Sequence, residues 1–264
     1  MTDPARTPVI VAAAQISDVV TPPEKAPTPL GLLIETAKKA GADSGAGTAL
    51  LGALDEIVVI RMFQDSNPRF KSPFGRMTNP PWSVAQGIGA SPRALLYPIG
   101  GGNMPQVMLS RACHLITRGE IQASLVAGVE MLRTELAARR AGLALDWSAD
   151  APSLPDEMGG HRHGYTDHEA AHGVKAALNI YPLIENAVRA ARGRSIEEHQ
   201  RSLGRLFARF AAVAKDNPLA TRRKGYTAEE IATVSPTNPM IAFPYTKLMC
   251  ASAYVDMAAA FIVT

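Results

Sequence analysis

Short apolar runs alternate with helix-forming segments along the first half of the chain, and this alternation restricts the possible folds more than any other feature. The runs Val9–Ala14 and Ile57–Ile60 are continuous and apolar, as in strands buried on both faces of a largely parallel sheet. Between them, Thr28 is placed to cap a helix and Pro29 suits the first helical position. The first third of the chain therefore predicts a βαβ unit with a right-handed crossover.

The same alternation continues beyond the second strand. A third strand is predicted at Arg93–Ile99, a helix at Met104–Arg118 that Gly119 closes, and a fourth strand at Ala123–Val129. The apolar run Ala258–Thr264 predicts one more strand. The fold class is therefore α/β, with a mixed, largely parallel sheet and flanking helices.

The helix predicted at Met104–Arg118 is apolar around most of its circumference. Its polar side chains gather on one narrow side: Ser110, Arg111, His114, Thr117 and Arg118. A helix of this kind has to be buried on more than one side. Because one sheet covers only one face of a helix, the sequence predicts a second layer, either from this chain or from a partner.

Two stretches depart from the alternation. Residues Asn67–Pro81 contain four prolines and no periodicity, which indicates a long surface loop of the kind that often carries function. From Arg133 to about Thr237 the composition shifts to Arg, Ala, Gly and Pro, with helical patterns at Leu183–Arg192 and Ser195–Lys215. This second stretch is predicted to be an insertion.

The composition is that of an ordinary globular protein. The chain has 264 residues, of which 47% are hydrophobic, so it can bury a sizeable core. A net charge of +3, from 27 basic and 24 acidic residues, offers no footprint for nucleic acid. Cys113 and Cys250 lie in apolar stretches without CxxC spacing, which favours core positions and a reducing compartment. No signal peptide or membrane span is recognisable, so we predict a cytoplasmic protein.

The turn between the third strand and the following helix has the sequence Gly100-Gly101-Gly102-Asn103. A buried strand that breaks directly into a helix has the shape of an active-site elbow, here without a nucleophile. Backbone amides at the start of such a helix can bind an oxyanion. Alternatively, the three glycines allow tight packing and positive φ at the turn. The residues alone leave both interpretations open.

Eight short segments match one known superfamily in order and spacing: Ile10–Ala13, Leu54–Val59, Pro98–Gln106, Leu125–Met131, Tyr181–Ala187, Asn217–Ala220, Phe243–Met249 and Val255–Ala260. Together they extend over nearly all of the chain. They resemble the N-terminal half of thiolase-superfamily proteins, in particular the thiolase-like proteins related to sterol-carrier-protein-type thiolases.

The resemblance implies a five-layer αβαβα architecture made of two βαβαβαββ halves, with a loop domain inserted into the first half. This chain would supply the N-terminal core as residues 1–132 and 245–264, and a mainly helical loop domain as residues 133–244. The helix after the elbow corresponds to the central helix that thiolases bury between their halves. The implied partners are a C-terminal half or a small accessory subunit, and a second copy that forms a homodimer through the third strand.

The resemblance also implies chemistry. Thiolases exchange acyl groups with coenzyme A in lipid metabolism through a cysteine nucleophile, assisted by a histidine and a second cysteine. In the thiolase frame Gly100 occupies the nucleophile position, while Gly101, Gly102 and Asn103 keep the backbone donors of an oxyanion-type loop. The other catalytic groups come from the C-terminal half. The implied protein is an acetyl-CoA acetyltransferase-like transferase that meets coenzyme A or acyl-CoA as a substrate and holds no permanent cofactor. The isolated chain is not expected to be an active thiolase.

Four histidines are candidate contacts for substrate or coenzyme A: His161, His163, His168 and His172. Two of them, His168 and His172, share a helical face at i, i+4 spacing that could hold a metal. Neighbouring glycines make a polar surface loop the stronger interpretation, and we predict no metal site.

Basic residues are abundant in the predicted loop domain and could contact the phosphates of coenzyme A, although solvated helix faces explain most such charges. They are Arg189, Arg192, Arg194, Arg201, Arg205, Arg209, Arg222, Arg223 and Lys224. Tyr245 and Lys247 lead back toward the core and are further catalytic candidates beside a structural role, because a tyrosine can act as an acid or base.

Two functional hypotheses follow. The first is an acyl-CoA enzyme, or a subunit of one, whose chemistry is not cysteine thiolysis; retro-aldol cleavage, as in thiolase-like aldolases that work with a small partner protein, needs no nucleophilic cysteine. The second is a non-catalytic thiolase half that binds acyl-CoA or a partner subunit. Neither hypothesis involves nucleic acid or a membrane.

Overall fold

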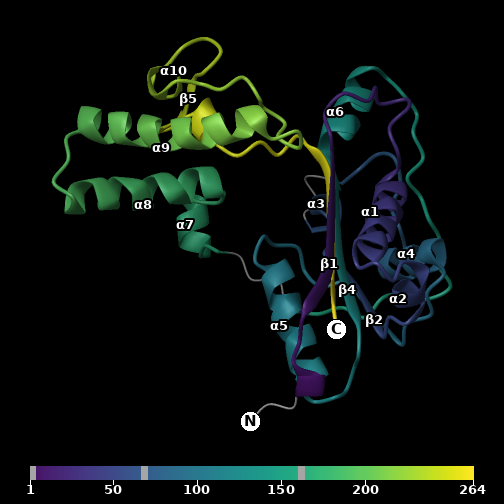
Figure 1. The fold of residues 1–264 in the computed structure, drawn as a ribbon. Coiled ribbons are helices and arrows are strands. Elements are labelled where there is room, and N and C mark those ends of the chain that lie inside the picture. Colours follow the sequence, from purple (N-terminus) through teal and green to yellow (C-terminus); the bar gives the residue numbers. More distant parts are fainter. Residues whose placement is uncertain (1–3, 67–70, 160–163) are drawn as a thin grey trace. The chain divides into compact units, whose positions relative to one another are not determined.

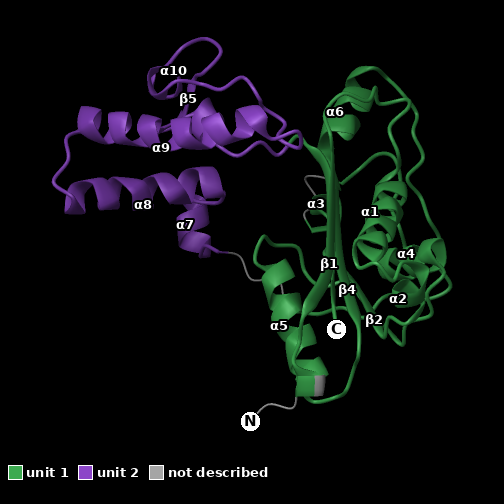
Figure 2. Cartoon of the chain, viewed as in Figure 1, with its two compact units in different colours: residues 1–161, 254–264 green, residues 162–253 purple. Residues whose placement is uncertain are grey.

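The computed structural model describes residues 4–66, 71–159 and 164–264. The chain forms two compact units, shown in different colours in Figure 2. Unit 1 comprises Met1–His161 and Tyr254–Thr264, and unit 2 comprises Arg162–Ala253. Within the described residues, no helix is both long and apolar enough to cross a bilayer.

Unit 1 is built on a five-stranded sheet with the order β1-β7-β4-β2-β3 (Figure 1). The strands are β1 (Ile10–Asp18), β2 (Glu56–Val59), β3 (Ala94–Leu96), β4 (Ser124–Met131) and β7 (Asp256–Val263). Strand β7 pairs antiparallel with both β1 and β4, while β2 pairs parallel with β3 and with β4. The predicted mixed, largely parallel α/β sheet is confirmed.

Strand β1 differs from its prediction as a strand buried on both faces. It forms one edge of the sheet and pairs only with β7, so Ala12 is buried whereas Ile10 is 52% exposed. Strands β1 and β2 run in the same direction on either side of α1 in the sequence, as in the predicted βαβ unit, and β7 and β4 lie between them in the sheet. An apolar run alone does not distinguish a central strand from an edge strand whose outer face is open.

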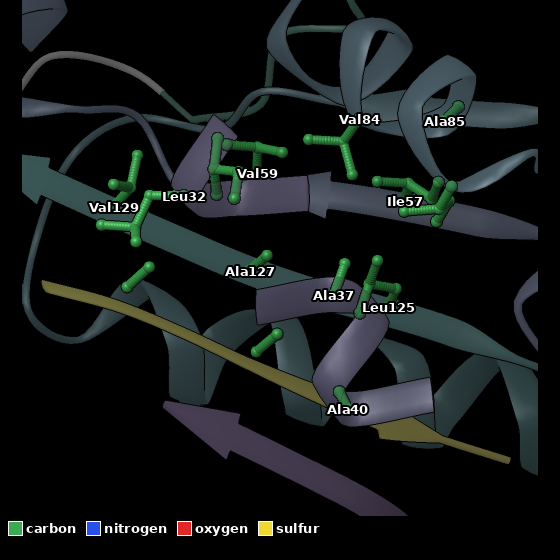
Figure 3. Packing of buried hydrophobic residues seen from close by; sticks show 14 of the residues in the cluster. Leu32, Ala37, Ala40, Ile57, Val59, Val84, Ala85, Leu125, Ala127 and Val129 are labelled. Atoms are coloured by element: carbon green, nitrogen blue, oxygen red, sulfur yellow. The ribbon is translucent and has the colours of Figure 1, made fainter. Parts of the chain in front are cut away.

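Three helices cover one face of the sheet: α1 (Pro29–Asp43), α2 (Thr48–Gly52) and α4 (Pro80–Ile88). Helix α1 begins as predicted, with Pro29 in its first turn and the Thr28 hydroxyl accepting the Gly31 N–H at 3.0 Å. Figure 3 shows residues of α1 and α4 packed against β2 and β4: Leu32, Ala37, Ala40, Val84, Ala85, Ile57, Val59, Leu125, Ala127 and Val129. This face is closed by a continuous apolar core.

Helix α5 (Met104–Thr117) lies on the opposite face of the sheet (Figure 1). It buries a single stripe that includes Met108, Ala112 and Ile116, while Val107 is 41% exposed. The stripe packs on strand residues of the second face such as Val126. One face of this widely apolar helix is therefore covered by the sheet, and the other is open in this chain.

The predicted long loop Asn67–Pro81 is shorter in the structure, because its end opens a helix. Asn79 caps α4 by accepting the Trp82 N–H at 3.1 Å, and Pro80 and Pro81 are buried in its first turn. A proline pair after asparagine is a helix start, which the sequence reading missed. Residues 67–70 lie outside the described residues. The short helix α3 (Phe63–Ser66) precedes them.

Residues 133–159 pack with unit 1, although the sequence placed the insertion boundary at 132/133. Helix α6 (Leu132–Arg140) is tied to β7, where the buried Asp256 carboxylate accepts the Thr134 hydroxyl at 2.6 Å. Further along, Trp147 stacks edge-on against Phe74 with ring centroids 5.4 Å apart. The boundary between the two compact units therefore lies at 161/162.

The same segment covers the outer edge of β3. The Tyr97 N–H donates to the Asp156 carbonyl at 2.9 Å, the Ile99 N–H donates to Met158 at 3.0 Å, and the Asp156 N–H donates to Leu95 at 2.8 Å. A second copy cannot pair with this edge while the segment occupies it.

Unit 2 is mainly helical, as predicted for the inserted domain. Its elements are α7 (Asp167–Ala171), α8 (Ala177–Ala191), α9 (Ile196–Asp216), α10 (Ala228–Ala232), β5 (Met240–Ala242) and β6 (Tyr245–Thr246). The small core joins Leu203, Ile231 and Met249. Buried Asn238 donates to the Ile231 carbonyl at 3.1 Å and accepts the Leu248 N–H at 2.9 Å, which keeps residues 245–253 in unit 2 although the sequence assigned them to the core.

A candidate site at the carboxyl ends of the parallel strands

The carboxyl ends of β2, β3 and β4 meet at one end of the unit 1 sheet, because these strands run parallel. Residues 61–66 follow β2 and residues 97–103 follow β3, while Glu130 is the second-last residue of β4. In open α/β sheets, ligands bind outside the carboxyl ends of the strands. The glycine elbow is therefore at the end of the sheet where a site is expected.

At the elbow, only Gly100 is required by packing. A Cβ at this position would lie 3.1 Å from the Arg61 carbonyl oxygen and 3.2 Å from the Ser66 Cβ, and it would collide with the Ser66 hydroxyl. Nothing lies within 4 Å of a Cβ added to Gly102. None of the three glycines has positive φ, so the tight-packing interpretation is confirmed at Gly100 and the positive-φ interpretation is wrong.

The elbow ends at the positive end of α5. The Met104 N–H donates to the Gly101 carbonyl at 3.0 Å, and Asn103 is the N-cap without a side-chain capping hydrogen bond. Pro105 follows in the first turn and brings no N–H of its own. A helix start of this kind favours negative charge, as the oxyanion-type interpretation requires.

Helix α3 connects the elbow to a buried tyrosine. The Tyr97 hydroxyl donates to the Asp65 carboxylate at 2.7 Å and accepts the Met62 N–H at 3.2 Å. The Arg61 guanidinium lies 4.7 Å from the Tyr97 ring centroid and donates to Glu157 at 2.6 Å. Burial, followed by the Asp65 charge, raises the pKa of Tyr97 far above its usual range, so this hydroxyl stays protonated and holds the loop.

Glu130 is the group best suited to move a proton. Its Oε1 accepts the Phe63 N–H at 2.7 Å. The pKa of Glu130 is raised to about 7, mainly by burial and to a smaller extent by the charges of Asp65 and Glu135, while the hydrogen bond from Phe63 acts in the opposite direction. A carboxyl group that titrates near neutral pH can serve as a general acid or base.

A cavity of about 710 Å³ lies on the α5 face of the sheet and connects these features. Its lining includes Gln15, Arg61, Pro105 and Glu130, together with apolar residues of β4 and β7. Pockets of this size, mostly apolar with a few polar groups, are typical of small-molecule sites. The cavity brings the start of α5 and Glu130 to one space.

Sequence reasoning missed Glu130, Tyr97 and Asp65. Glu130 lies inside the matched segment Leu125–Met131. A single acidic residue within an apolar strand was the feature of the sequence that could have indicated its role. The pairing of Tyr97 with Asp65 joins residues 32 positions apart and left no local pattern. Arg111 was assigned to the polar side of its helix, but its side chain forms an ion pair with Glu56, which is 1% exposed.

Two of the histidine candidates, His168 and His172, belong to unit 2, whereas the elbow and Glu130 belong to unit 1. His161 and His163 fall outside the described residues. His168 and His172 are exposed around α7, with ring centroids 4.6 Å apart and the His172 Nδ1 2.9 Å from the His168 carbonyl oxygen. Among the described residues, no group of three or more metal-ligating side chains occurs.

The other candidates belong to unit 2 or to helix α5. The Tyr245 hydroxyl donates to Glu185 at 2.6 Å, and burial together with this carboxylate raises the pKa of Tyr245 well above its usual range. Lys247 is exposed in the same unit. Cys113 and Cys250 are free and only partly buried, rather than deep in a core. The structure therefore gives Tyr245 a partner within unit 2 and leaves its catalytic role untested.

Comparison with known proteins identifies the fold. No protein-family model matches the chain, and no curated protein matches it in sequence. A crystal structure does match: a monomeric SCP2-thiolase-like protein type 1 from Mycobacterium smegmatis, with a TM-score of 0.75 and 28% identity, covers 100% of this chain and 47% of its own. The chain has a thiolase-like fold. This agrees with the resemblance carried by the eight segments.

Two more distant solved structures share the thiolase-like fold. An Ltp2–ChsH2(DUF35) aldolase matches with a TM-score of 0.61 and 15% identity over 98% of this chain and 56% of its own. An acetyl-CoA acetyltransferase from Syntrophomonas wolfei matches with a TM-score of 0.53 and 18% identity over 97% of this chain and 64% of its own. The chain thus spans about half to two thirds of the length of the thiolase-like structures it matches.

Proposed function

We propose that this chain is the first half of a thiolase-like protein that acts on acyl-CoA thioesters without a cysteine nucleophile. The observation that carries the proposal is the packing at Gly100. The elbow has the position and helix start of a nucleophile turn, yet it offers no side chain there and no room for one beside Ser66. Ordinary thiolysis needs a thiolate at this point and is not expected.

Acid–base chemistry at Glu130 is the mechanism that fits the remaining groups. In a retro-aldol cleavage, a base removes the proton of a β-hydroxyl group, the Cα–Cβ bond breaks to a ketone, and the electron pair moves onto the thioester as an enolate. The same acid then returns the proton to Cα. Glu130 has the proton affinity for both steps, and amides at the start of α5 would stabilise the enolate oxygen. The fold shared with an aldolase that has a DUF35 partner supports this reaction class.

A second βαβαβαββ half would cover the α5 face. Apolar side chains are exposed on this face, including Val107 of α5 and Met257 of the cavity lining. The partner would cover them and exclude water from Glu130. The same surface supports the second candidate function, a non-catalytic half that binds acyl-CoA and a partner subunit. The free cysteines suit a cytoplasmic protein.

For the assembly we propose no homodimer through the third strand, contrary to the expectation from the resemblance. The edge of β3 is already paired with residues 156–158. One SCP2-thiolase-like structure with this fold is monomeric, which supports the proposal.

Binding of acetyl-CoA to the 264-residue chain, measured by calorimetry, tests the proposal. Saturable binding supports it, and no binding of acetyl-CoA or of free coenzyme A contradicts it. Thiolysis of acetoacetyl-CoA by the unmodified chain would instead overturn the cysteine-free mechanism.

Release of a ketone from a tertiary β-hydroxyacyl-CoA, whose Cβ carries two further carbon substituents, separates the two candidate functions. Turnover that falls at least about 100-fold in Glu130→Gln, but not in the exposed control Glu24→Gln, supports the acid–base enzyme. A chain that binds acetyl-CoA but shows no turnover supports the non-catalytic half.

A further inference from the structure

Helix α9 is apolar on two sides, and unit 2 buries one of them. A Cβ added to Gly204 would lie 2.4 Å from a backbone oxygen of α10, so Gly204 marks the inner side of the helix. At about 3.6 residues per turn, Leu206, Phe210 and Val213 lie on the opposite side. Their side chains are 47%, 61% and 71% exposed. This stripe, at i, i+4 and i+7 spacing, is an apolar surface open to solvent.

Helix α8, beside α9 in Figure 1, continues the apolar surface. Its residues Tyr181, Ile184 and Val188 follow i, i+3 and i+7 spacing, and their side chains are exposed as well. Val188 and Leu206 line one cavity between the two helices, so the two stripes are adjacent there. Single exposed apolar side chains are ordinary, but a contiguous patch over two helices is typical of an interaction surface.

Charged residues lie along the edge of the apolar stripe of α9. Arg205, Arg209 and Asp216 are exposed and share one side of the helix. Arg205 and Asp216 are about 16 Å apart along the axis, so they do not pair within one helix. Neither forms an ion pair or a side-chain hydrogen bond with any residue that the structure describes. The edge is basic at its start and acidic at its end, so it is complementary to a copy of itself that runs in the opposite direction.

We propose that this face of α9 binds the same face of a second copy, with the two helices antiparallel and centred on Phe210. Phe210 then meets its own counterpart, and Leu206 meets Val213 of the second copy. Arg205 meets Asp216 of the second copy beside these apolar contacts. The last two contacts occur twice, as in any two-fold interface. A parallel pair would instead place Arg205 against Arg205, where like charges repel each other.

The available apolar area is in the range that a dimer needs, which is about 800 Å² per partner. Aromatic side chains bury about 150–250 Å² each, so Tyr181 and Phe210, which are 60% and 61% exposed, supply roughly 200 Å². The aliphatic residues of both stripes and the charged edge add to this area. A monomeric SCP2-thiolase-like protein shares the fold, so the interface depends on the side chains of these helices and not on the fold.

Sedimentation velocity of the 264-residue chain, at about 1–100 μM, tests the proposal. We expect a monomer–dimer equilibrium whose dissociation constant rises at least about 50-fold in Phe210→Asp, because an aromatic side chain at the centre of an interface contributes most to binding. The control Val107→Asp places the same charge on the open face of unit 1 and should change the constant less than about twofold. Circular dichroism verifies that both variants are folded.

Charge reversal tests the antiparallel arrangement. Arg205→Asp and Asp216→Arg each bring like charges together and should weaken the dimer at least about fivefold. Arg205→Asp/Asp216→Arg restores pairs of opposite charge and should recover most of the loss. Because the two residues are too far apart to pair within one chain, recovery requires contact between copies. A double variant as weak as the single variants would overturn the antiparallel arrangement.

Other occupants of this face give different results. A chain that stays monomeric at about 100 μM would overturn the proposal, and so would equal weakening by Phe210→Asp and Val107→Asp. Co-sedimentation of a monomeric chain with vesicles of phosphatidylcholine and phosphatidylserine, lost in Phe210→Asp, would assign the face to an anionic lipid surface instead. The face belongs to unit 2 and the candidate site to unit 1, so these results leave acetyl-CoA binding as a separate question.

Discussion

The two faces of the unit 1 sheet are covered very differently. The face that carries α1, α2 and α4 is closed, and residues such as Leu33 and Ile57 are 0% exposed. Among the described residues, the other face carries α5 alone, beside a cavity of about 710 Å³ and exposed apolar side chains such as Met257, 38% exposed. The closed face contains the apolar core of the unit, whereas the open face contains the candidate site.

The largest difference is expected between core truncations on the two faces. Leu33→Ala removes a fully buried side chain of α1 and should lower the free energy of unfolding by about 2–5 kcal/mol. Met257→Ala on the open face should cost less than about 1 kcal/mol. Urea unfolding followed by circular dichroism measures both. Similar costs for the two variants would mean that the open face is already filled in solution, for example by a second copy.

Besides its apolar stripe, helix α5 contacts the sheet through an ion pair between Arg111 and the buried Glu56, which is the next test. Arg111→Met leaves Glu56, 1% exposed, with the Ser124 hydroxyl at 2.9 Å as its remaining partner, and should cost about 3 kcal/mol. The control Arg118→Met breaks an exposed pair with Glu120 just beyond the C-terminus of α5 and should cost less than about 1 kcal/mol. Urea unfolding compares the two.

Replacing both partners sharpens this test. Glu56→Leu/Arg111→Met removes the stranded charge and should recover most of the lost stability. A double variant that is no more stable than Arg111→Met would show that the packing of the arginine stem, and not the buried charge, holds α5 on the sheet.

The difference between the closed and the open face of the sheet also explains which elements could be predicted from the sequence. The closed face was readable because Thr28 and Pro29 mark a helix start and because apolar residues recur along α1 at helical spacing. The open face misled the interpretation of β1, since an edge strand with exposed apolar side chains has the same sequence pattern as a buried strand. The sequence of a strand alone does not reveal whether the strand lies at the centre or at the edge of its sheet.

The candidate site was predictable only in part. Gly100 was found because a strand, a glycine turn and a helix are consecutive in the chain. Its neighbour Ser66, which makes the glycine necessary, comes from helix α3 and left no local signal. The pKa of Glu130 likewise depends on burial by distant segments, so it could not be inferred from its position in β4.

The raised pKa of Glu130, on the open face, should make the stability of the chain depend on pH. Its pKa is raised from 4.5 to about 7 in the folded state, so the folded chain binds more protons than the unfolded chain in this window. Stability should therefore be highest below pH 4.5 with respect to this group and fall as the pH rises to about 7, by about 3 kcal/mol in total. Glu130→Gln keeps the acceptor for the Phe63 N–H and should flatten that slope.

Unfolding by urea at several pH values compares Glu130→Gln with the exposed control Glu24→Gln. A partner that covers the α5 face would raise the pKa of Glu130 further and steepen the slope. Identical slopes in the wild-type chain and Glu130→Gln would show that water reaches this carboxylate freely and would remove it as the acid–base candidate.

The smallest expected effect concerns the elbow, and it tests whether Ser66 and Arg61 leave space for a side chain at position 100. Gly100→Cys should cost about 1–3 kcal/mol because the new Cβ meets Ser66 and the Arg61 carbonyl oxygen, whereas Gly102→Cys, with nothing within 4 Å, should be nearly neutral. Ser66→Gly combined with Gly100→Cys should recover part of the loss, which a double-mutant cycle of urea unfolding measures. A neutral Gly100→Cys would mean that Ser66 moves aside without cost. The nucleophile position would then be sterically available, and the absence of thiolysis would depend on the missing thiol alone.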